Sequence, residues 1–338
     1  MASGFKTATI QTGQVTGTLT DFPVTVDLSD VGITTLAEAE SVRVYSDSAK
    51  STELAREIVS ATEMYVKVPS ASTSTSIYVD FDGVQSDYAA TATYGRNNVW
   101  SDYYRVFHLN ESSGSVAVDS TGNQDGTYQG SLPTQVTSDY INGHDLVIGN
   151  GDYVSGLGTA QLNNQDFTVT SYLHRDTSSN FGVLGKNQSG VSFEIRLEIS
   201  SGNTLRNRIK TSPGTDINFT GSTNLAAGTD YHCAWTFDVS AIAGEVFVNG
   251  SSDGTGTGSG TMFANSSDLV IGASRNDGGT YPYDGSIYML RVRREVMSDD
   301  WISAESNCVM NPTAFWGTWT DVTVTEPDTV NPNVSWWS

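Results

Sequence analysis

One glycine-rich loop gathers three side chains that could bind a metal ion. Asp119, Asn123 and Asp125 fall within the stretch Asp119-Ser-Thr-Gly-Asn-Gln-Asp-Gly126. Hard cations such as Ca²⁺ bind several oxygens on a tight, flexible turn, which this spacing would supply. The same residues also suit an Asx-turn loop, in which Asp and Asn side chains bond to their own backbone. The sequence therefore predicts either a calcium site or a self-bonded loop.

Sugar recognition is the second chemistry that the residues suggest. Tyr281 and Tyr283 stand beside Asn276 and Asp277 in one loop, and Tyr153 ends the short stretch Asn-Gly-Asp-Tyr in another. Ligand sites combine aromatic surface with a few placed polar groups, and sugar sites follow this rule. We interpret these five residues as candidate glycan-binding residues. Ordinary loop packing is the alternative for each of them.

Glycoside hydrolysis requires two carboxyl groups about 5–9.5 Å apart. Glu194 and Glu198 share one face of an expected strand, but at about 3.3 Å per residue they are roughly 13 Å apart. Arg196 lies between them, so a Glu-Arg-Glu charge ladder is the simpler account. Asp80 and Asp82 have a suitable spacing of about 6.6 Å, on an expected edge or surface strand. We therefore expect no enzymatic activity.

Other catalytic signatures are weak. The four histidines are scattered along the chain, and no G-x-S-x-G occurs. His108 and His232 fall in expected strands and are interpreted as structural. The two cysteines exclude a disulfide framework, and no CxxC spacing exists. Cys233, within Tyr-His-Cys-Ala-Trp, is expected to be a small core residue.

Charge and composition narrow the classes of partner. The chain has 338 residues with 38 acidic and 17 basic side chains, a net charge of −21. This field repels a phosphate backbone, so nucleic-acid binding is not expected. No segment approaches the roughly 18 apolar residues of a membrane span. The start Met-Ala-Ser-Gly-Phe-Lys lacks a secretory signal, so we expect a protein outside the cell to leave by another route, such as an assembled virus.

Short alternating segments predict an all-β first module over residues 1–103. Thr35-Leu-Ala-Glu38 has the spacing of a capping box and predicts a short helix over 35–40. Expected strands include Ala8–Ile10, Val24–Leu28, Val42–Tyr45, Glu57–Val59, Tyr65–Val68 and Ser76–Phe81. Six or so short strands in such a length favour a sandwich or barrel.

The same module resembles the domain of unknown function catalogued as 2341. The matching landmarks are Thr20-Asp-Phe-Pro-Val-Thr-Val-Asp-Leu28, Glu57-Ile-Val59, Tyr65-Val-Lys-Val-Pro69, Ser72-Thr-Ser-Thr-Ser-Ile-Tyr-Val79 and Tyr94-Gly-Arg-Asn-Asn-Val-Trp100. The resemblance covers about residues 5–103 and implies a fold and a context, since the family has no established chemistry. Trp100, Tyr103 and Tyr104 are too apolar for a flexible linker and are expected to pack the modules together.

Residues 104–310 resemble a laminin-G / concanavalin-A-like lectin module. The landmarks are the opening Val106-Phe-His-Leu109, Tyr231-His-Cys-Ala-Trp-Thr-Phe-Asp238, Glu245-Val-Phe-Val-Asn-Gly250 and Gly285-Ser-Ile-Tyr-Met-Leu-Arg-Val292. The resemblance implies a jelly roll followed by one short helix. Ser298 suits the N-cap of that helix, and Met297 and Ile302 have the spacing of a hydrophobic staple.

The resemblance also bears on calcium. In such modules the Asp119 loop lies near the last strand, which often supplies another carboxylate. Here Tyr288 occupies that position, so we consider Asp284 as the residue that would supply the carboxylate instead. The implied ligand set is therefore Asp119, Asn123, Asp125 and Asp284, with Ca²⁺ as the only cofactor.

Residues 311–338 form a tryptophan-rich extension. Phe315–Trp319 is interpreted as closing a sandwich. Trp336 and Trp337 either bury locally or anchor the chain on a neighbouring subunit, because tryptophan carries a large apolar surface.

Together these features predict an all-β protein of two β-sandwich modules, the second a laminin-G/concanavalin-A-like jelly roll with one short helix. The pairing resembles bacteriophage virion proteins, namely capsid-decoration or tail and fibre accessory proteins. That resemblance implies a capsid or tail partner, a virion-surface location, an outward module that holds host or environmental glycans, and a homotrimer. A secreted or cell-surface lectin-like adhesin is the first alternative, and a glycan hydrolase is the second.

Overall fold

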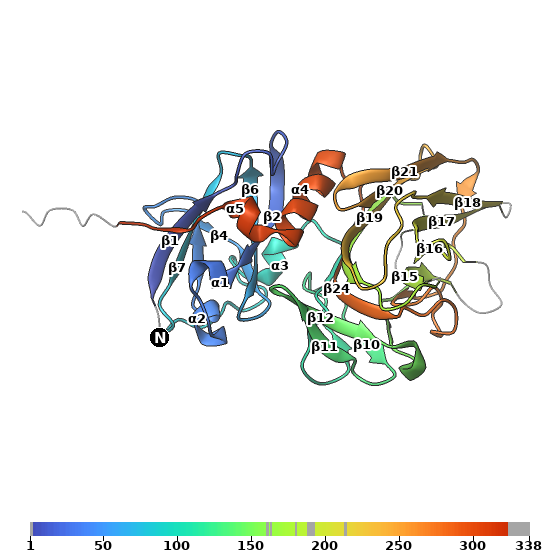
Figure 1. Ribbon diagram of the computed structural model, residues 1–338, viewed down its shortest axis with the longest axis horizontal. Helices are drawn as coiled ribbons and strands as arrows, with labels where there is room; N and C mark the ends of the chain where they lie inside the picture. The colour runs from blue at the N-terminus through green and yellow to red at the C-terminus, as the bar shows by residue number, and fades with distance from the viewer. Residues whose placement is uncertain are drawn as a thin grey trace, which may run out of the picture.

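The computed structural model describes residues 3–159, 162, 164–179, 181–187, 193–212 and 215–323. Within these residues the chain forms two β-sandwiches that lie side by side (Figure 1). Antiparallel strands dominate and helices are few, so the predicted all-β fold class with a concanavalin-like jelly roll is confirmed. No helix in these described residues is long and apolar enough to cross a membrane.

The first sandwich packs two antiparallel sheets face to face. Its strands are β1 (Gly4–Thr9), β2 (Leu19–Asp27), β3 (Arg43–Tyr45), β4 (Glu53–Leu54), β5 (Arg56–Ile58), β6 (Glu63–Ala71), β7 (Ser76–Phe81) and β25 (Thr320–Asp321). One sheet has the order β25-β1-β7-β3-β4 and the other β2-β6-β5. Because side chains alternate along β7, Ile77, Val79 and Phe81 enter the core. Asp80 points to the opposite face of this central strand, where it pairs with Lys50 at 2.7 Å.

Three short helices lie in the described residues of this part of the chain, and side chains of Asp27 and Thr35 cap the first two. The helices are α1 (Leu28–Val31), α2 (Leu36–Glu40) and α3 (Arg96–Val99). The predicted capping box is confirmed: the Glu38 amide donates to the Thr35 hydroxyl at 3.3 Å, and the Thr35 amide donates to the Glu38 carboxylate at 3.2 Å.

The second sandwich is the jelly roll. Its strands are β8 (Arg105–Phe107), β9 (Val116–Ala117), β10 (Gly126–Gln129), β11 (Thr134–Ser138), β12 (Ile141–Leu146), β13 (Tyr153–Ser155), β14 (Phe167–His174), β15 (Phe181–Lys186), β16 (Ile195–Ile199), β17 (Leu205–Ser212), β18 (Thr215–Thr220), β19 (Asp230–Asp238), β20 (Ala243–Val248), β21 (Ser251–Thr257), β22 (Thr261–Met262), β23 (Leu269–Ile271) and β24 (Gly285–Arg293). A 3-10 turn spans Ile148–Asn150.

We call its two layers the junction sheet and the distal sheet. The junction sheet, β11-β12-β24-β14-β19-β20-β21 with β8 on β24, lies toward the first sandwich. The distal sheet, β18-β17-β16-β15-β23-β13-β10-β9 with β22 on β17, lies on the far side (Figure 1). Strands β16 and β17 form a hairpin across Ser201-Gly-Asn, with Ile199 opposite Leu205.

Helix α4 (Asp299–Met310) lies between the sandwiches, in the core of the first and against the outer face of the junction sheet (Figure 1). The Ser298 hydroxyl accepts the Trp301 amide at 3.2 Å, so the predicted N-cap is confirmed. Trp301 and Cys308 enter the core of the first sandwich. Ile302 packs with Ala234 and Phe247 of the junction sheet, together with Met297 as the staple spacing predicts.

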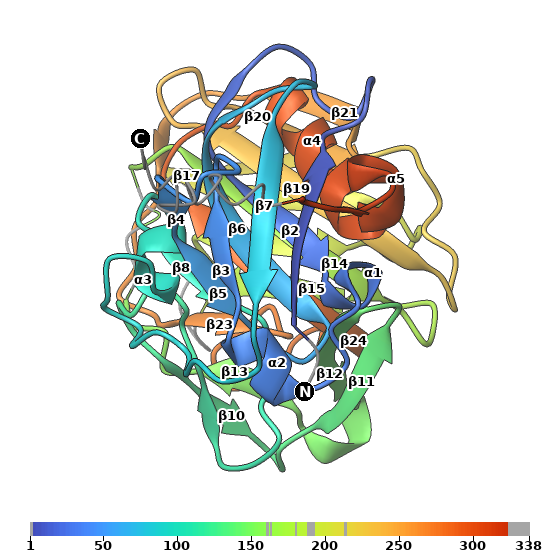
Figure 2. The same ribbon diagram turned by 90° about the vertical axis from the view of Figure 1, so that its left-hand side faces the viewer.

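The chain then returns to the first sandwich. Helix α5 (Pro312–Trp316) lies against that sandwich in both views (Figures 1 and 2). Phe315, Trp316 and Trp319 join its core, so the residues expected to close a sandwich close the first one. Trp336 and Trp337 lie outside the described residues, and their anchoring role stays a prediction.

Candidate functional site

The predicted calcium loop is held by its own side chains. Asp119 is fully buried, and its carboxylate accepts the backbone amides of Val106 at 3.0 Å, Thr121 at 3.1 Å and Gln124 at 3.1 Å. Asp125 accepts the amide of Asp119 at 2.9 Å. This is the self-bonded arrangement that formed the alternative to a metal site.

The structure separates Asp284 from that loop, so the predicted set of four ligands is wrong. Asp119 bridges to Phe107, which pairs with Leu290 on β24, whereas Asp284 precedes the opposite end of that strand. Six residues of extended chain span roughly 20 Å. Asp284 instead accepts the Thr177 hydroxyl at 2.7 Å. Among the described residues, no group of three or more His, Cys, Asp or Glu side chains could hold a metal ion.

The remaining members of the set have structural partners. The Asn123 side-chain amide donates to the Tyr104 carbonyl at 3.2 Å. Tyr288, at the position expected for an acid, is buried beside Tyr172 with ring centroids 5.1 Å apart.

The two predicted sugar loops meet in space, with one correction. Tyr283 is fully buried, and its hydroxyl donates to the His174 carbonyl at 2.8 Å, so its inclusion as a sugar-facing residue is wrong. Tyr153 packs against the loop of Asn276, and its hydroxyl reaches the Asn276 carbonyl at 3.5 Å. Asp277 is exposed and Tyr281 half-buried. Tyr281 has a positive φ of 47°, so the backbone turns between the two tyrosines instead of alternating as a strand does.

Two glycines let this loop cross the solvent face of the distal sheet. A Cβ atom on Gly185 would lie 2.6 Å from the Ser274 backbone, and one on Gly182 would lie 2.3 Å from it. The Ser274 hydroxyl donates to Glu198 on the next strand at 3.0 Å. The loop therefore forms a wall along the distal sheet beside β16.

The acids considered for hydrolysis are engaged by cations. Glu194 accepts a bond from Lys186 at 2.8 Å, and Glu198 accepts one from Arg206 at 2.6 Å. Both carboxylates are fully buried. Arg196 approaches Glu198 only to 4.0 Å, so the expected Glu-Arg-Glu ladder forms on one side alone.

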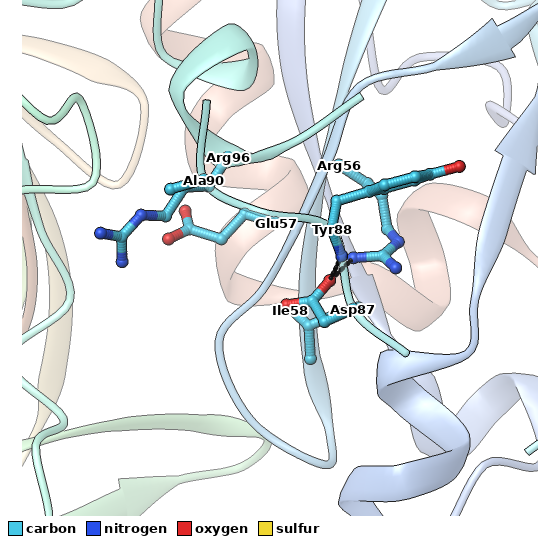
Figure 3. Close-up of a pocket in the computed structure, with 7 residues that line it drawn as sticks. All are labelled: Arg56, Glu57, Ile58, Asp87, Tyr88, Ala90 and Arg96. Carbon is cyan, nitrogen blue, oxygen red and sulfur yellow. Dashed lines mark hydrogen bonds and ion pairs between the residues drawn. The ribbon is translucent and has the colours of Figure 1, made fainter. Parts of the chain in front are cut away.

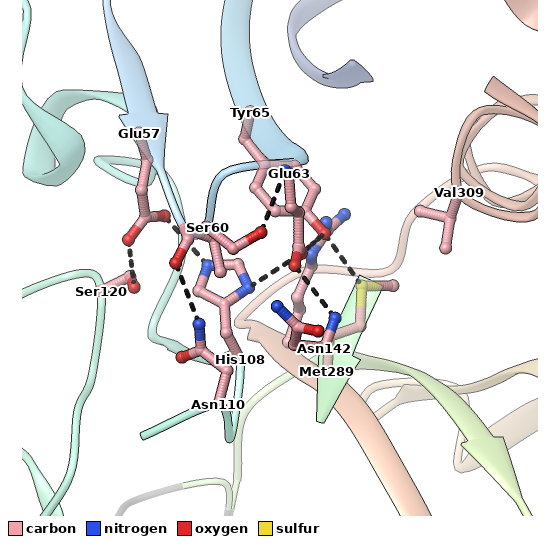
Figure 4. A network of polar contacts seen from close by, with 12 residues as sticks. Glu57, Ser60, Glu63, Tyr65, His108, Asn110, Ser120, Asn142, Met289 and Val309 are labelled. Carbon is pink, nitrogen blue, oxygen red and sulfur yellow. Dashed lines mark hydrogen bonds and ion pairs between the residues drawn. The ribbon is translucent and has the colours of Figure 1, made fainter. Parts of the chain in front are cut away.

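A second polar region lies at the junction of the sandwiches, and sequence reasoning did not identify it. His108 of the jelly roll stands between two glutamates of the first sandwich (Figure 4). Its Nε2 lies 3.0 Å from Glu57 and its Nδ1 lies 3.9 Å from Glu63. The Ser120 hydroxyl donates to Glu57 at 2.6 Å, and the backbone amide of Asn142 donates to Glu63 at 3.3 Å. These are contacts between the modules, because residues 104 onward supply the donors.

The two glutamates differ in pKa although both are buried. Burial raises the pKa of Glu63 to about 7, because His108 and the Tyr65 hydroxyl only partly offset it. Burial also acts to raise the pKa of Glu57, but His108 and the donors Ser120 and Trp100 outweigh it and lower that pKa.

A buried ion pair continues the junction toward α4. Arg291 of β24 contacts Glu305 of α4 at 3.1 Å, and Thr170 donates to the same carboxylate at 2.6 Å. His232 Nε2 lies 3.5 Å from that carboxylate. Burial opposes ionisation, but Arg291 and His232 outweigh it and lower the pKa of Glu305 to about 2.

Two small polar pockets open on either side of Glu57. One pocket, of about 180 Å³, is lined by Arg56, Glu57, Asp87, Tyr88 and Arg96 among others (Figure 3). The Arg56 guanidinium is tied to Asp87 within it. The other, of about 130 Å³, lies beside His108 and Ser120. Both are much smaller than the roughly 300 Å³ at which small-molecule sites begin.

Comparison with known families agrees with this architecture. Residues 148–303 match the model of the concanavalin A-like lectin/glucanases superfamily. This part of the chain is therefore a concanavalin A-like lectin/glucanase domain. No curated protein matches the chain.

Several solved structures are similar to parts of this chain at low identity. The Trypanosoma rangeli sialidase matches with 15% identity and a TM-score of 0.47, over 62% of this chain and 33% of that one. Domain 4 of the extracellular arabinanase AbnA from Geobacillus stearothermophilus, solved with arabinotriose, matches with 17% identity and a TM-score of 0.47, over 61% and 98%. The binding domain of Paraclostridial Mosquitocidal Protein 1 matches with 12% identity and a TM-score of 0.48, over 62% and 53%. The chain thus spans about a third of the length of the sialidase.

Proposed function

We propose that this chain is a non-enzymatic structural protein of a bacteriophage virion, acting in capsid decoration or as a tail or fibre accessory. In this proposal the first sandwich attaches to a capsid or tail protein, and the jelly roll faces outward and holds glycans. The observation that carries the proposal is α4, because its Trp301 enters the core of the first sandwich while its Ile302 packs on the outer face of the junction sheet. A shared helix holds both sandwiches in one orientation, as a display spacer requires.

The engaged acids of the jelly roll support a role without catalysis. A glycosidase needs one carboxyl group to donate a proton and a second to act as nucleophile or base. Glu194 and Glu198 are instead buried against Lys186 and Arg206. The resemblance of the pairing of the two modules to bacteriophage virion proteins supports the virion setting.

Mass spectrometry of purified phage particles tests the virion role. We expect the chain in a fixed ratio to the major capsid or tail protein, and light scattering of the free protein to give the mass of a homotrimer. Glycan binding by a protein that is missing from the particles would favour the adhesin instead.

A glycan array tests the binding role. Tyr281→Ala should weaken binding roughly tenfold, because a lost stacking contact with a sugar is comparable to other aromatic contacts. Tyr78→Ala, on the first sandwich, is the matched control and should bind as the native protein does. EDTA would abolish binding only if the Asp119 loop holds Ca²⁺, and release of reducing sugar would favour the hydrolase.

A further inference from the structure

The solvent face of the distal sheet carries a cluster of cations, which we call the cationic shelf: Arg196, Arg206, Arg208 and Lys210. Strand alternation places all four on one face, because the residues between them, such as Leu197 and Ile209, point into the core. Arg196 of β16 is paired directly opposite Arg208 of β17. Like charges directly opposite each other destabilise a sheet, so this pairing calls for a compensating anion.

An aromatic ring lies at the centre of the shelf. The Phe193 ring centroid lies 4.4 Å from the Arg196 guanidinium, 4.9 Å from that of Arg208 and 5.4 Å from the Lys210 ammonium. The negative face of the ring attracts each cation, but it does not neutralise three of them. The ring holds the cations together against their mutual repulsion.

The carboxylates of the shelf are too few to neutralise it. Asp216 contacts Arg208 at 2.9 Å and Lys210 at 2.7 Å, and Glu198 contacts Arg206 at 2.6 Å. Arg196 has only the 4.0 Å approach to Glu198. Within the described residues, the buried Nε atoms of Arg196 and Arg208 have no hydrogen-bond partner. Four cations therefore face two carboxylates, in a chain whose net charge is −21.

The shelf adjoins the wall formed by the tyrosine loop. Gly185, over which Ser274 crosses, is paired with Arg196 on the neighbouring strand. Burial and the charge of Arg208 lower the pKa of Arg196, while Glu198 and the Tyr281 phenol act in the opposite sense. Aromatic surface and unsatisfied cations lie next to each other.

We infer that the cationic shelf binds the acid groups of an anionic glycan, a sugar chain that bears carboxylate or sulfate groups. This inference rests on the proposed glycan-binding function and names the class of its ligand. Guanidinium groups match the geometry of such oxyanions and bind them in pairs of hydrogen bonds. Separate acid groups on a sugar suit a short cluster of cations on an otherwise acidic chain.

The test compares immobilised polygalacturonate, dextran sulfate, neutral dextran and single-stranded DNA as probes for the full chain. We expect binding to polygalacturonate, to dextran sulfate or to both, and a decline as salt rises. Arg196→Gln and Arg208→Gln should each weaken that binding roughly tenfold, the effect of one lost charged hydrogen bond. Arg294→Gln removes an exposed arginine outside the shelf and should leave binding unchanged. Arg196→Lys keeps the charge but loses the forked guanidinium group. Its affinity should therefore lie between that of Arg196→Gln and that of the native protein.

Each contrary outcome has a distinct meaning. Binding of neutral dextran alone would overturn the inference while leaving glycan binding intact. DNA binding that is lost in Arg196→Gln would overturn it in favour of a general polyanion surface. Undiminished binding in both glutamine variants would also overturn it. Binding to none of the sugars would contradict the proposed function as well.

Discussion

Two regions of this protein bury charged side chains, and they do so in opposite ways. At the junction, Arg291 and Glu305 are sealed between the sandwiches with matched charge, and Thr170 adds a donor. On the cationic shelf, Arg196 and Arg208 face each other and remain in reach of solvent. Buried charges without a partner are costly, so a closed ion pair marks a place where structure depends on both members. A solvent-accessible cluster with more cations than carboxylates marks a place where a ligand can supply the missing negative charge.

The largest effect should come from breaking the closed pair. Glu305→Ala leaves Arg291 buried without its carboxylate, and removing one partner of a buried pair costs about 3–5 kcal/mol. Denaturant unfolding should show this loss of stability. If the free energy of unfolding of Glu305→Ala lay within about 1 kcal/mol of the native value, the Arg291–Glu305 pair would contribute no more than a weak surface salt bridge. The two regions would then not differ in the way described.

The pH dependence of stability should show the next largest effect, through Glu63. Its pKa rises from 4.5 to about 7 on folding, so between these pH values the unfolded chain has released a proton that the folded chain keeps. Stability from this group is therefore complete below pH 4.5 and falls as pH rises to about 7, by about 3 kcal/mol. Glu63→Gln should remove this fall.

Unfolding measured at pH 5 and pH 8 gives the comparison. We expect the glutamine variant to gain stability relative to the native protein at the higher pH. Glu305, whose pKa is lowered to about 2, acts in the opposite sense and only at acid pH below this window. Parallel pH profiles for the two proteins would show that Glu63 ionises freely in the folded chain.

A smaller effect is expected where the tyrosine loop crosses the distal sheet. Gly185→Ala places a methyl group 2.6 Å from the Ser274 backbone, and such overpacking typically costs about 1–3 kcal/mol. Gly149→Ala is the control, because no atom lies within 4 Å of its new Cβ. Thermal unfolding of both variants tests the packing, and equal melting temperatures would mean that the loop moves without cost.

The smallest effect on stability should come from the shelf itself. Arg196→Gln removes a cation that has no close carboxylate and that opposes Arg208. The free energy of unfolding should change by about 1 kcal/mol or less, as for partly exposed pairs. Comparing this value with that of Glu305→Ala measures the difference between a charge kept for the fold and a charge kept for a ligand. A loss as large as at Glu305 would make the shelf a structural element.

Several features of the fold could be predicted from residues that lie close together in the chain. The capping box at Thr35 and the N-cap at Ser298 each depend on residues close together in the chain, and both predictions are confirmed. The candidate sites depended on distant strands and were predicted only in part. Tyr153 does meet the loop of Asn276, whereas Tyr283 turns inward.

By itself the sequence determined the class of the protein: alternating strands, capped short helices and a jelly roll in the second part of the chain. These features follow from side-chain period and backbone preference, which act over a few residues. Only the tertiary structure decided that Asp284 lies far from Asp119, that α4 packs between the two sandwiches, and that His108 meets Glu57 and Glu63. It also set Arg196 opposite Arg208. The physical reason is that strand order and register join residues across long stretches of chain, and burial then fixes which face of each strand meets solvent.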